Sequence, residues 1–286
     1  SANYHEVNAE YLIEKRNYQE AMQAIDTAIQ LEPSNRRSAI KGNIYFRLHD
    51  HVKAKQLLLA AIKDETDQEL EMYHYLLAEI AVYEGDYQNA TKYLEKLKQL
   101  DAQQSKYYAM QAYVYAKQIR DELPLAEKEK LQAQVTEHIK LAKEKDPEMK
   151  DAVTDNYLGL NYYLTNESTE ALKYYDKAIE LNPDYPVFYN NRALVYYYDG
   201  DNEAAHKDLT KAIELDKLEP EFYFGRAYVS MTMKQEDAAI GDFSKAVELD
   251  KNYLARVPED MKDKLPKKDE KTTEAGMKAM LILALD

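Results

Sequence analysis

One pattern, repeated at a nearly constant interval, restricts most strongly what this chain can fold into. Aligning the sequence with itself reveals six similar segments, each with an alanine near its start. These alanines are Ala21, Ala54, Ala90, Ala171, Ala205 and Ala239. Most of them recur at intervals of about 34 residues, a period typical of repeat proteins. The interval from Ala90 to Ala171 is more than twice as long, which indicates a further, irregular copy of the same unit.

The composition indicates that each unit is helical. The 286 residues include only 7 glycines and 8 prolines, which leaves few residues for the tight turns of a sheet. Long stretches consist of strong helix formers such as Ala, Leu, Glu, Lys and Gln. The chain has no cysteine, so disulfides and thiolate metal sites are excluded. We therefore expect an all-α protein.

Small residues recur in phase with these units, and on them the chain resembles the tetratricopeptide repeat family, whose unit of about 34 residues has two antiparallel helices, A and B. They are Gly42, Ala78, Gly159, Ala193 and Ala227 in the A helices, the six alanines above in the B helices, and Ala28, Ala61, Ala178, Ala212 and Ala246 two turns later. Small residues let helix backbones approach closely. The resemblance implies a bacterial tetratricopeptide repeat protein: a right-handed superhelical α-solenoid of about seven helix-turn-helix repeats.

The repeats define the expected domain organisation. We place the solenoid at 2–253, with repeats at about 2–34, 35–70, 71–104, 105–151, 152–185, 186–219 and 220–253. In the fourth repeat the interval from Ala112 to Pro147 is longer than the corresponding interval from Gly159 to Pro183. The excess is about 11 residues, or three helical turns. An extended helix B is therefore expected there in preference to a disordered loop.

The C-terminal part differs from the repeats. Residues 254–272 are charged and contain two prolines, which predicts a linker with room for a short helix. Residues 273–286 have an apolar stripe that includes Met277, Met280 and Leu285, which predicts a C-terminal helix. This helix could cap the open end of the stack, form a dimer contact or insert into the groove.

The run Tyr196-Tyr197-Tyr198 cannot share one buried face, because successive helical residues point about 100° apart. By its place in the repeat, Tyr196 is a core position, whereas its two neighbours border the concave groove in which family members bind peptides. The same positions give the expected binding groove. It consists of Asn156, Leu160, Tyr163, Asn190, Asn191, Leu194, Tyr197, Tyr198, Phe224 and Tyr228.

Two interpretations of these aromatic positions remain open. Tyrosine offers broad contact area and a hydroxyl, and asparagine can pair with the main chain of an extended ligand. However, tyrosine makes up 26 of the 286 residues, so aromatic groove positions could also serve packing. Near the N-terminus the groove positions are polar and mixed in sign: Glu6, Glu10, Arg36, Asn43 and Arg47.

Charge and hydropathy exclude several partners. The net charge of −14 opposes binding to nucleic acid, since phosphates require concentrated Lys and Arg. No apolar run approaches the roughly 20 residues of a membrane span, so no transmembrane segment is expected. The sequence starts with Ser1 instead of Met, so a leader could have been removed, and both a cytoplasmic and an exported location remain open.

Motifs for catalysis or cofactors are not found in the sequence. It has no glycine-rich phosphate loop, no GxSxG and no HExxH. His49-Asp50-His51 is the single histidine cluster, and we interpret it as a solvated turn, so that no metal site or cofactor is predicted. Most carboxylates have a lysine three or four residues away, which stabilises helices.

We therefore expect a non-catalytic scaffold that binds a peptide or helix of a partner protein in its concave groove. Two alternatives remain: self-assembly as a homodimer through the groove or the C-terminal helix, and a targeting part of a larger enzyme or complex.

Overall fold

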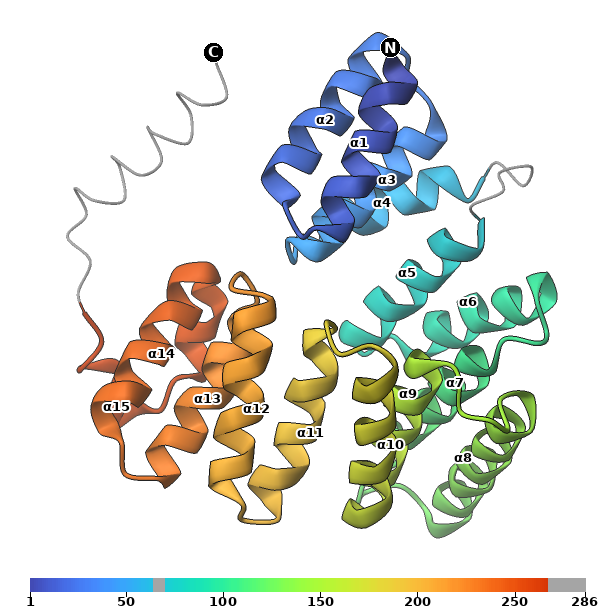
Figure 1. The fold of residues 1–286 in the computed structure, drawn as a ribbon. Helices are drawn as coiled ribbons and strands as arrows, with labels where there is room; N and C mark the ends of the chain where they lie inside the picture. Colours follow the sequence, from blue (N-terminus) through green and yellow to red (C-terminus); the bar gives the residue numbers. More distant parts are fainter. Residues whose placement is uncertain (64–69, 267–286) are drawn as a thin grey trace. The chain divides into compact units, whose positions relative to one another are not determined.

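The computed structural model describes residues 1–63 and 70–266, and the chain divides into two compact units. Unit 1 is Ser1–Asn182 and unit 2 is Pro183–Asp286. All regular secondary structure in the described residues is helical, and they contain no strand (Figure 1). The predicted C-terminal helix at 273–286 lies outside the described residues.

Unit 1 consists of helix hairpins stacked on one another. Its helices are α1 (Ala2–Glu14), α2 (Tyr18–Leu31), α3 (Asn35–Arg47), α4 (His51–Ala61), α5 (Leu70–Tyr83), α6 (Tyr87–Leu100), α7 (Ser105–Ala116), α8 (Leu125–Lys145), α9 (Ala152–Leu164) and α10 (Ser168–Leu181). Each odd-numbered helix packs against the next helix of its hairpin, and α2, α4 and α6 also contact the first helix of the following hairpin. The first helix of each hairpin therefore buries its apolar face against the second helix of the same hairpin and against the neighbouring hairpins.

The turn inside most hairpins of both units has one recurring backbone conformation. A residue with positive φ stands at Arg16, His49, Gly85, Asn166, Gly200 and Lys234. In several turns the polar residue after it caps the second helix; for example, Asp50 Oδ1 accepts a hydrogen bond from the backbone N–H of Lys53 at 3.1 Å. The sequence run His49-Asp50-His51 is one of these turns.

Helix α8, with 21 residues, is the longest helix within 1–63 and 70–266, whereas the second helices of the other hairpins there have 11 to 14. Its C-terminal half is held against α9 and α10 by Lys143. The Lys143 ammonium donates a hydrogen bond to the Tyr162 hydroxyl at 2.6 Å and lies 5.2 Å from the centre of the Tyr174 ring. The two rings are stacked, with 5.4 Å between their centres. The cation and the two rings thus join three helices.

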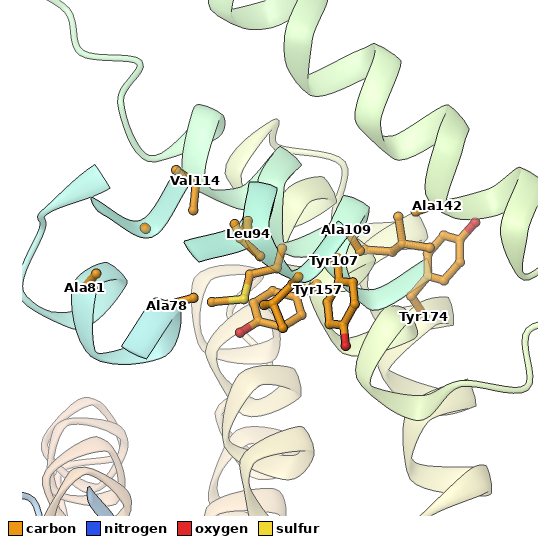
Figure 2. Close-up of a cluster of buried hydrophobic side chains, with 13 residues drawn as sticks. Ala78, Ala81, Leu94, Tyr107, Ala109, Val114, Ala142, Tyr157 and Tyr174 are labelled. Carbon is orange, nitrogen blue, oxygen red and sulfur yellow. The ribbon is translucent and has the colours of Figure 1, made fainter. Parts of the chain in front are cut away.

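The interior of unit 1 alternates alanines with large side chains. In the cluster of Figure 2, Ala78 and Ala109 are fully buried beside Leu94 and Tyr107. One close helix contact is at Gly159 on α9, where an added Cβ would lie 2.7 Å from the ring of Tyr175 on α10. Because that ring is itself fully buried, glycine is the residue that fits.

Unit 2 has two hairpins followed by a short irregular segment. Its elements are α11 (Pro186–Tyr198), α12 (Asn202–Leu215), α13 (Pro220–Thr232), α14 (Glu236–Leu249), the 3-10 helix η1 (Lys251–Arg256) and α15 (Glu259–Lys262). Within residues 251–262, which we call the C-terminal strap, every fourth side chain from Tyr253 to Met261 is buried. This stretch overlaps the predicted charged linker. It packs against unit 2 because Tyr253, Val257 and Met261 are buried, whereas most of the residues between them are exposed.

No helix within 1–63 and 70–266 has the length and apolar character that a membrane crossing requires.

Candidate binding surface

The three consecutive tyrosines of α11 have different surroundings. Tyr196 and Tyr197 are half-buried and pack against the cluster of Ala193, Ala205, Leu209 and Val229. Tyr198 is 68% exposed, and its ring meets that of Tyr197 edge-on at 5.5 Å. The sequence argument therefore identifies one packed tyrosine, whereas the structure has two, because the interior of unit 2 extends around α11 as far as Tyr197.

Polar and apolar side chains continue along α11 beside Tyr198. Leu194, one helical turn earlier, is 38% exposed. Asn190 and Asn191 are half-buried, and the amide of Asn190 donates to the Asn191 carbonyl at 3.4 Å. We call Asn190, Asn191, Leu194, Tyr197 and Tyr198 the α11 surface. Besides the half-buried Tyr197, it has two exposed large side chains, Leu194 and Tyr198, and two amides within three helical turns. This combination suits contact with both the side chains and the main chain of a peptide.

The C-terminal strap covers one of the two predicted groove residues on α13 and hydrogen-bonds to the other. Phe224 is 5% exposed and lies under the Arg256 guanidinium, whose carbon is 4.4 Å from the ring centre. The Tyr228 hydroxyl donates to the backbone carbonyl of Arg256 at 3.3 Å. Arg256 in turn pairs with Glu221 at 2.8 Å. Phe224 thus offers no surface of its own to a ligand in this structure.

Three residues of the expected binding groove lie in unit 1, on α9, with different exposures. Asn156 is buried, and Leu160 and Tyr163 are half-buried. Leu160 packs against the cluster of Figure 2. These three side chains therefore contribute to the interior at least as much as to the surface.

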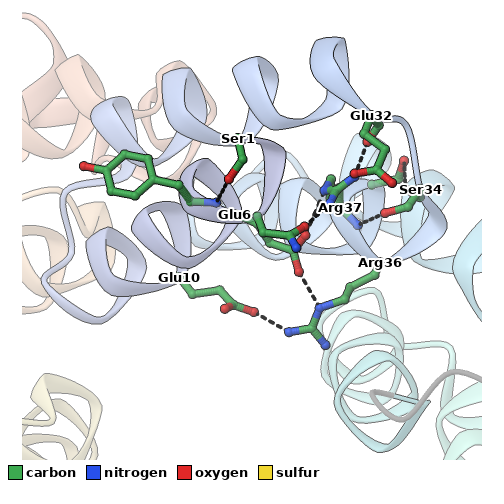
Figure 3. Close-up of polar contacts among 10 residues, drawn as sticks. Ser1, Glu6, Glu10, Glu32, Ser34, Arg36 and Arg37 are labelled. Atoms are coloured by element: carbon green, nitrogen blue, oxygen red, sulfur yellow. Dashed lines mark hydrogen bonds and ion pairs between the residues drawn. The ribbon is translucent and has the colours of Figure 1, made fainter.

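At the N-terminus of unit 1 the charged groove positions neutralise one another. Figure 3 shows Arg36 between Glu6 and Glu10, at 2.6 and 2.8 Å. Arg37, which is 5% exposed, pairs with the second oxygen of Glu6 at 2.8 Å and donates to the backbone carbonyl of Glu32. The sequence marks these charges as groove positions, but only the structure shows that they join α1 to α3.

One carboxylate that the sequence did not single out lies between α5 and α9. The Tyr157 hydroxyl donates to Glu79 Oε1 at 3.4 Å. Burial raises the pKa of Glu79, while Arg47 and the hydroxyls of Tyr75 and Tyr157 oppose that shift. The one signal in the sequence is that Glu79 directly follows Ala78, a small residue of the repeat pattern. Its partner Tyr157 stands on a helix two hairpins further along the chain and could not be predicted.

The described residues contain no group of three or more His, Cys, Asp or Glu side chains that could hold a metal ion. The Asp50 carboxylate of the histidine turn caps α4 and pairs with the Lys53 ammonium at 2.7 Å. His51 stacks on Tyr83, with 4.3 Å between the ring centres. These side chains therefore serve the packing of the turn.

Hairpins of about 34 residues, joined through alanine and glycine contacts, define an α-helical repeat protein. Comparison with known proteins gives the family. A "TPR repeat" model matches residues 159–200, and two "Tetratricopeptide repeat" models match 190–253 and 73–104. The chain is a tetratricopeptide repeat protein. Repeats of this family are generally non-catalytic scaffolds for protein–protein interaction.

Solved structures agree with the predicted all-α repeat fold. A tetratricopeptide repeat protein from Parabacteroides merdae is similar with a TM-score of 0.53 and 15% identity, over 89% of this chain and 97% of that one. A chain of the APC/C hetero-tetramer Cut9-Hcn1 is similar with a TM-score of 0.56 and 12% identity, over 92% of this chain and 55% of that one. At these identities the likeness concerns the fold. A search of curated proteins gives no significant match.

Proposed function

We propose that this protein is a non-catalytic scaffold that binds a peptide or helix of a partner protein through the α11 surface. The observation that carries the proposal is the exposure of Tyr198 and Leu194 on one side of α11, beside Asn190 and Asn191. Aromatic groups are typical anchors of protein interfaces, because a rigid ring buries much area at little entropic cost.

The strap supports placing the site on α11 in preference to α13. It already covers Phe224 and bonds to Tyr228. A partner can therefore reach the α11 surface without displacing any part of the strap. Leu160, Tyr163 and Asn156 lie on α9 in unit 1 and are proposed as a separate, lesser surface, since they are half-buried or buried.

Family and fold are consistent with this function. Repeat solenoids present extended surfaces to other proteins. The structure that contains the Cut9-Hcn1 chain is itself a hetero-tetramer. If the protein is the targeting part of a larger enzyme or complex, it would bind its target through the same surface.

The test uses a photo-crosslinking amino acid at position 198, with position 83 as the matched control. Tyr83 is 71% exposed and Tyr198 is 68% exposed, so the two positions are matched in exposure. Cells of the native organism are irradiated, and captured proteins are identified by mass spectrometry. We expect a partner that is captured from position 198 and not from position 83, and whose binding to the purified Leu194→Ala, Tyr198→Ala variant falls at least about tenfold.

Equal capture from both positions, or unchanged binding to the folded double variant, would contradict the α11 site. Circular dichroism shows whether the variant retains its helices. Both replaced side chains are exposed, so little loss of stability is expected.

Self-assembly is the second candidate, and one observation favours it. Tyr4, Val7 and Tyr11 follow one another at helical spacing on α1 and are 67%, 64% and 54% exposed. Such an apolar stripe is typical of a contact surface. Light scattering at several concentrations, on the wild type and on Val7→Glu, tests it: a dimer that the variant makes monomeric supports self-assembly, and a wild type that stays monomeric contradicts it.

A further inference from the structure

A carboxyl group is buried in unit 1 without a hydrogen-bond partner. Asp155 lies on α9 and is 0% exposed, and neither of its side-chain oxygens has a partner. Leu158, Gly159 and Tyr162 match the W-x2-L-G-x2-Y pattern of tetratricopeptide repeats, and Asp155 stands at the position of the Trp. A position that ordinarily fills the space between two helices thus holds an ionisable group.

The groups around Asp155 offer it little compensation. Two further carboxylates, Asp146 and Asp151, act on it from the turn between α8 and α9. From α10 it is influenced by Lys177, whose ammonium pairs with Glu180 at 3.0 Å. Helix α7 also packs against α9, and no charged group of α7 acts on Asp155.

The Ser105 hydroxyl of α7 lies 2.7 Å from the hydroxyl of Thr154, the residue before Asp155 on α9. Thr154 donates in turn to Asp151 Oδ2 at 2.8 Å. Both hydroxyls are therefore engaged with each other and with Asp151, and they leave Asp155 unsolvated.

We propose that Asp155 is a proton-operated switch in unit 1. With its proton in place, α9 packs closely against α7 and α10. When the proton leaves, a buried negative charge without a partner loosens these helices. The switch acts on unit 1 by itself and requires no bound partner.

The pH at which the switch operates follows from the surroundings. Burial first, and then Asp146 and Asp151, raise the pKa of Asp155 to about 7, with Lys177 opposing. In the unfolded chain an Asp has a pKa of about 3.9. The folded protein therefore binds this proton more tightly, and stability is lost as the pH rises from about 4 to about 7. Above about 7 the loss is complete.

The experiment compares the full chain with Asp155→Asn, which keeps the size of the side chain but cannot ionise. Asp121→Asn, at an exposed position, is the control with the same change in charge. Melting temperatures are measured by circular dichroism at pH 5 and pH 8. We expect the melting temperature of Asp155→Asn, relative to wild type, to be higher at pH 8 than at pH 5 by on the order of 5 °C. Asp121→Asn should show no such difference.

A second measurement uses the wild type alone and so does not depend on how the variant folds. The carboxyl carbon of Asp155 is followed by nuclear magnetic resonance from pH 4 to pH 9. A midpoint near 7 supports the switch. A midpoint near 4, or a melting difference for Asp155→Asn that is the same at pH 5 and pH 8, overturns it.

Discussion

Arg226 on α13 holds Asp242 on α14 through two parallel hydrogen bonds, from Nε and Nη2, each 2.8 Å long. In the preceding hairpin, at the equivalent positions of the repeat, Arg192 holds Asp208 in the same way at 2.7 Å. Arg226 also donates from Nη1 to Thr210 on α12 at 3.2 Å. One two-point ion pair is thus repeated within each hairpin of unit 2, and the second also ties its hairpin to the one before.

We expect Arg226→Met to lower the free energy of unfolding by about 1–3 kcal/mol, because it leaves the mostly buried Asp242 without its partner. Lys245→Met is the control, since Lys245 and Glu248 form an exposed pair at 3.4 Å whose loss should cost about 0–1 kcal/mol. Urea unfolding followed by circular dichroism measures both. Equal effects of the two substitutions would show that the Arg226 pair contributes no more than a surface pair.

Gly159→Ala should destabilise unit 1, whereas Gly241→Ala should stabilise α14. At Gly159 a methyl group meets the Tyr175 ring, and overpacking of this kind costs about 1–3 kcal/mol. At Gly241 nothing lies within 4 Å of the new Cβ, so the helix gains about 1 kcal/mol from alanine. Thermal unfolding of both variants distinguishes the two effects. A rise in melting temperature for Gly159→Ala would mean that the ring can move.

Val257→Ala should weaken the attachment of the C-terminal strap. Val257 is 3% exposed, and removing two buried methyl groups should cost about 1–2 kcal/mol. Amide hydrogen exchange in α13 and α14 should become faster, with exchange in unit 1 unchanged. Leu254→Ala is the matched control, because Leu254 lies in the same segment and is 46% exposed. Unchanged exchange in α13 with Val257→Ala would show that the strap does not protect that helix.

His74 should make the protein less stable in mild acid. This side chain is 6% exposed, and burial, followed by the charge of Lys96, lowers its pKa below the usual value. The unfolded chain takes up the proton first, at about pH 6.5, so stability is complete above that pH and is lost as the pH falls below it. Urea midpoints from pH 7.5 to 5.5 should fall less for His74→Leu than for the wild type. Parallel pH curves would count against His74 as a source of acid sensitivity.

The repeat pattern was sufficient to predict the all-α repeat fold. Alanine or glycine at a fixed interval indicates that helices pack closely at these positions. The pattern can be recognised within each repeat, without knowledge of the rest of the fold. Gly159 illustrates it, because its place in the pattern already marked a helix contact. Its particular partner, the Tyr175 ring, depends on the next helix and could not be read from the spacing.

The exposure of the candidate site residues was harder to predict from the sequence. Tyr197 and Tyr198 are both groove positions by their place in the repeat, yet one packs inward and the other projects. Phe224 is covered by Arg256, which comes after α14 in a segment with the composition of a linker. Burial of this kind depends on which distant segment folds back, and periodicity carries no information about it.

The helices, their period and the small residues through which they touch could be predicted, because they follow from composition and from spacing along one chain. Which side chains are enclosed became known from the folded chain: the two tyrosines that pack, Phe224 under the strap and the carboxyl of Asp155. Enclosure depends on contacts between residues far apart in sequence, and the same Asp is solvated or buried according to what packs against it.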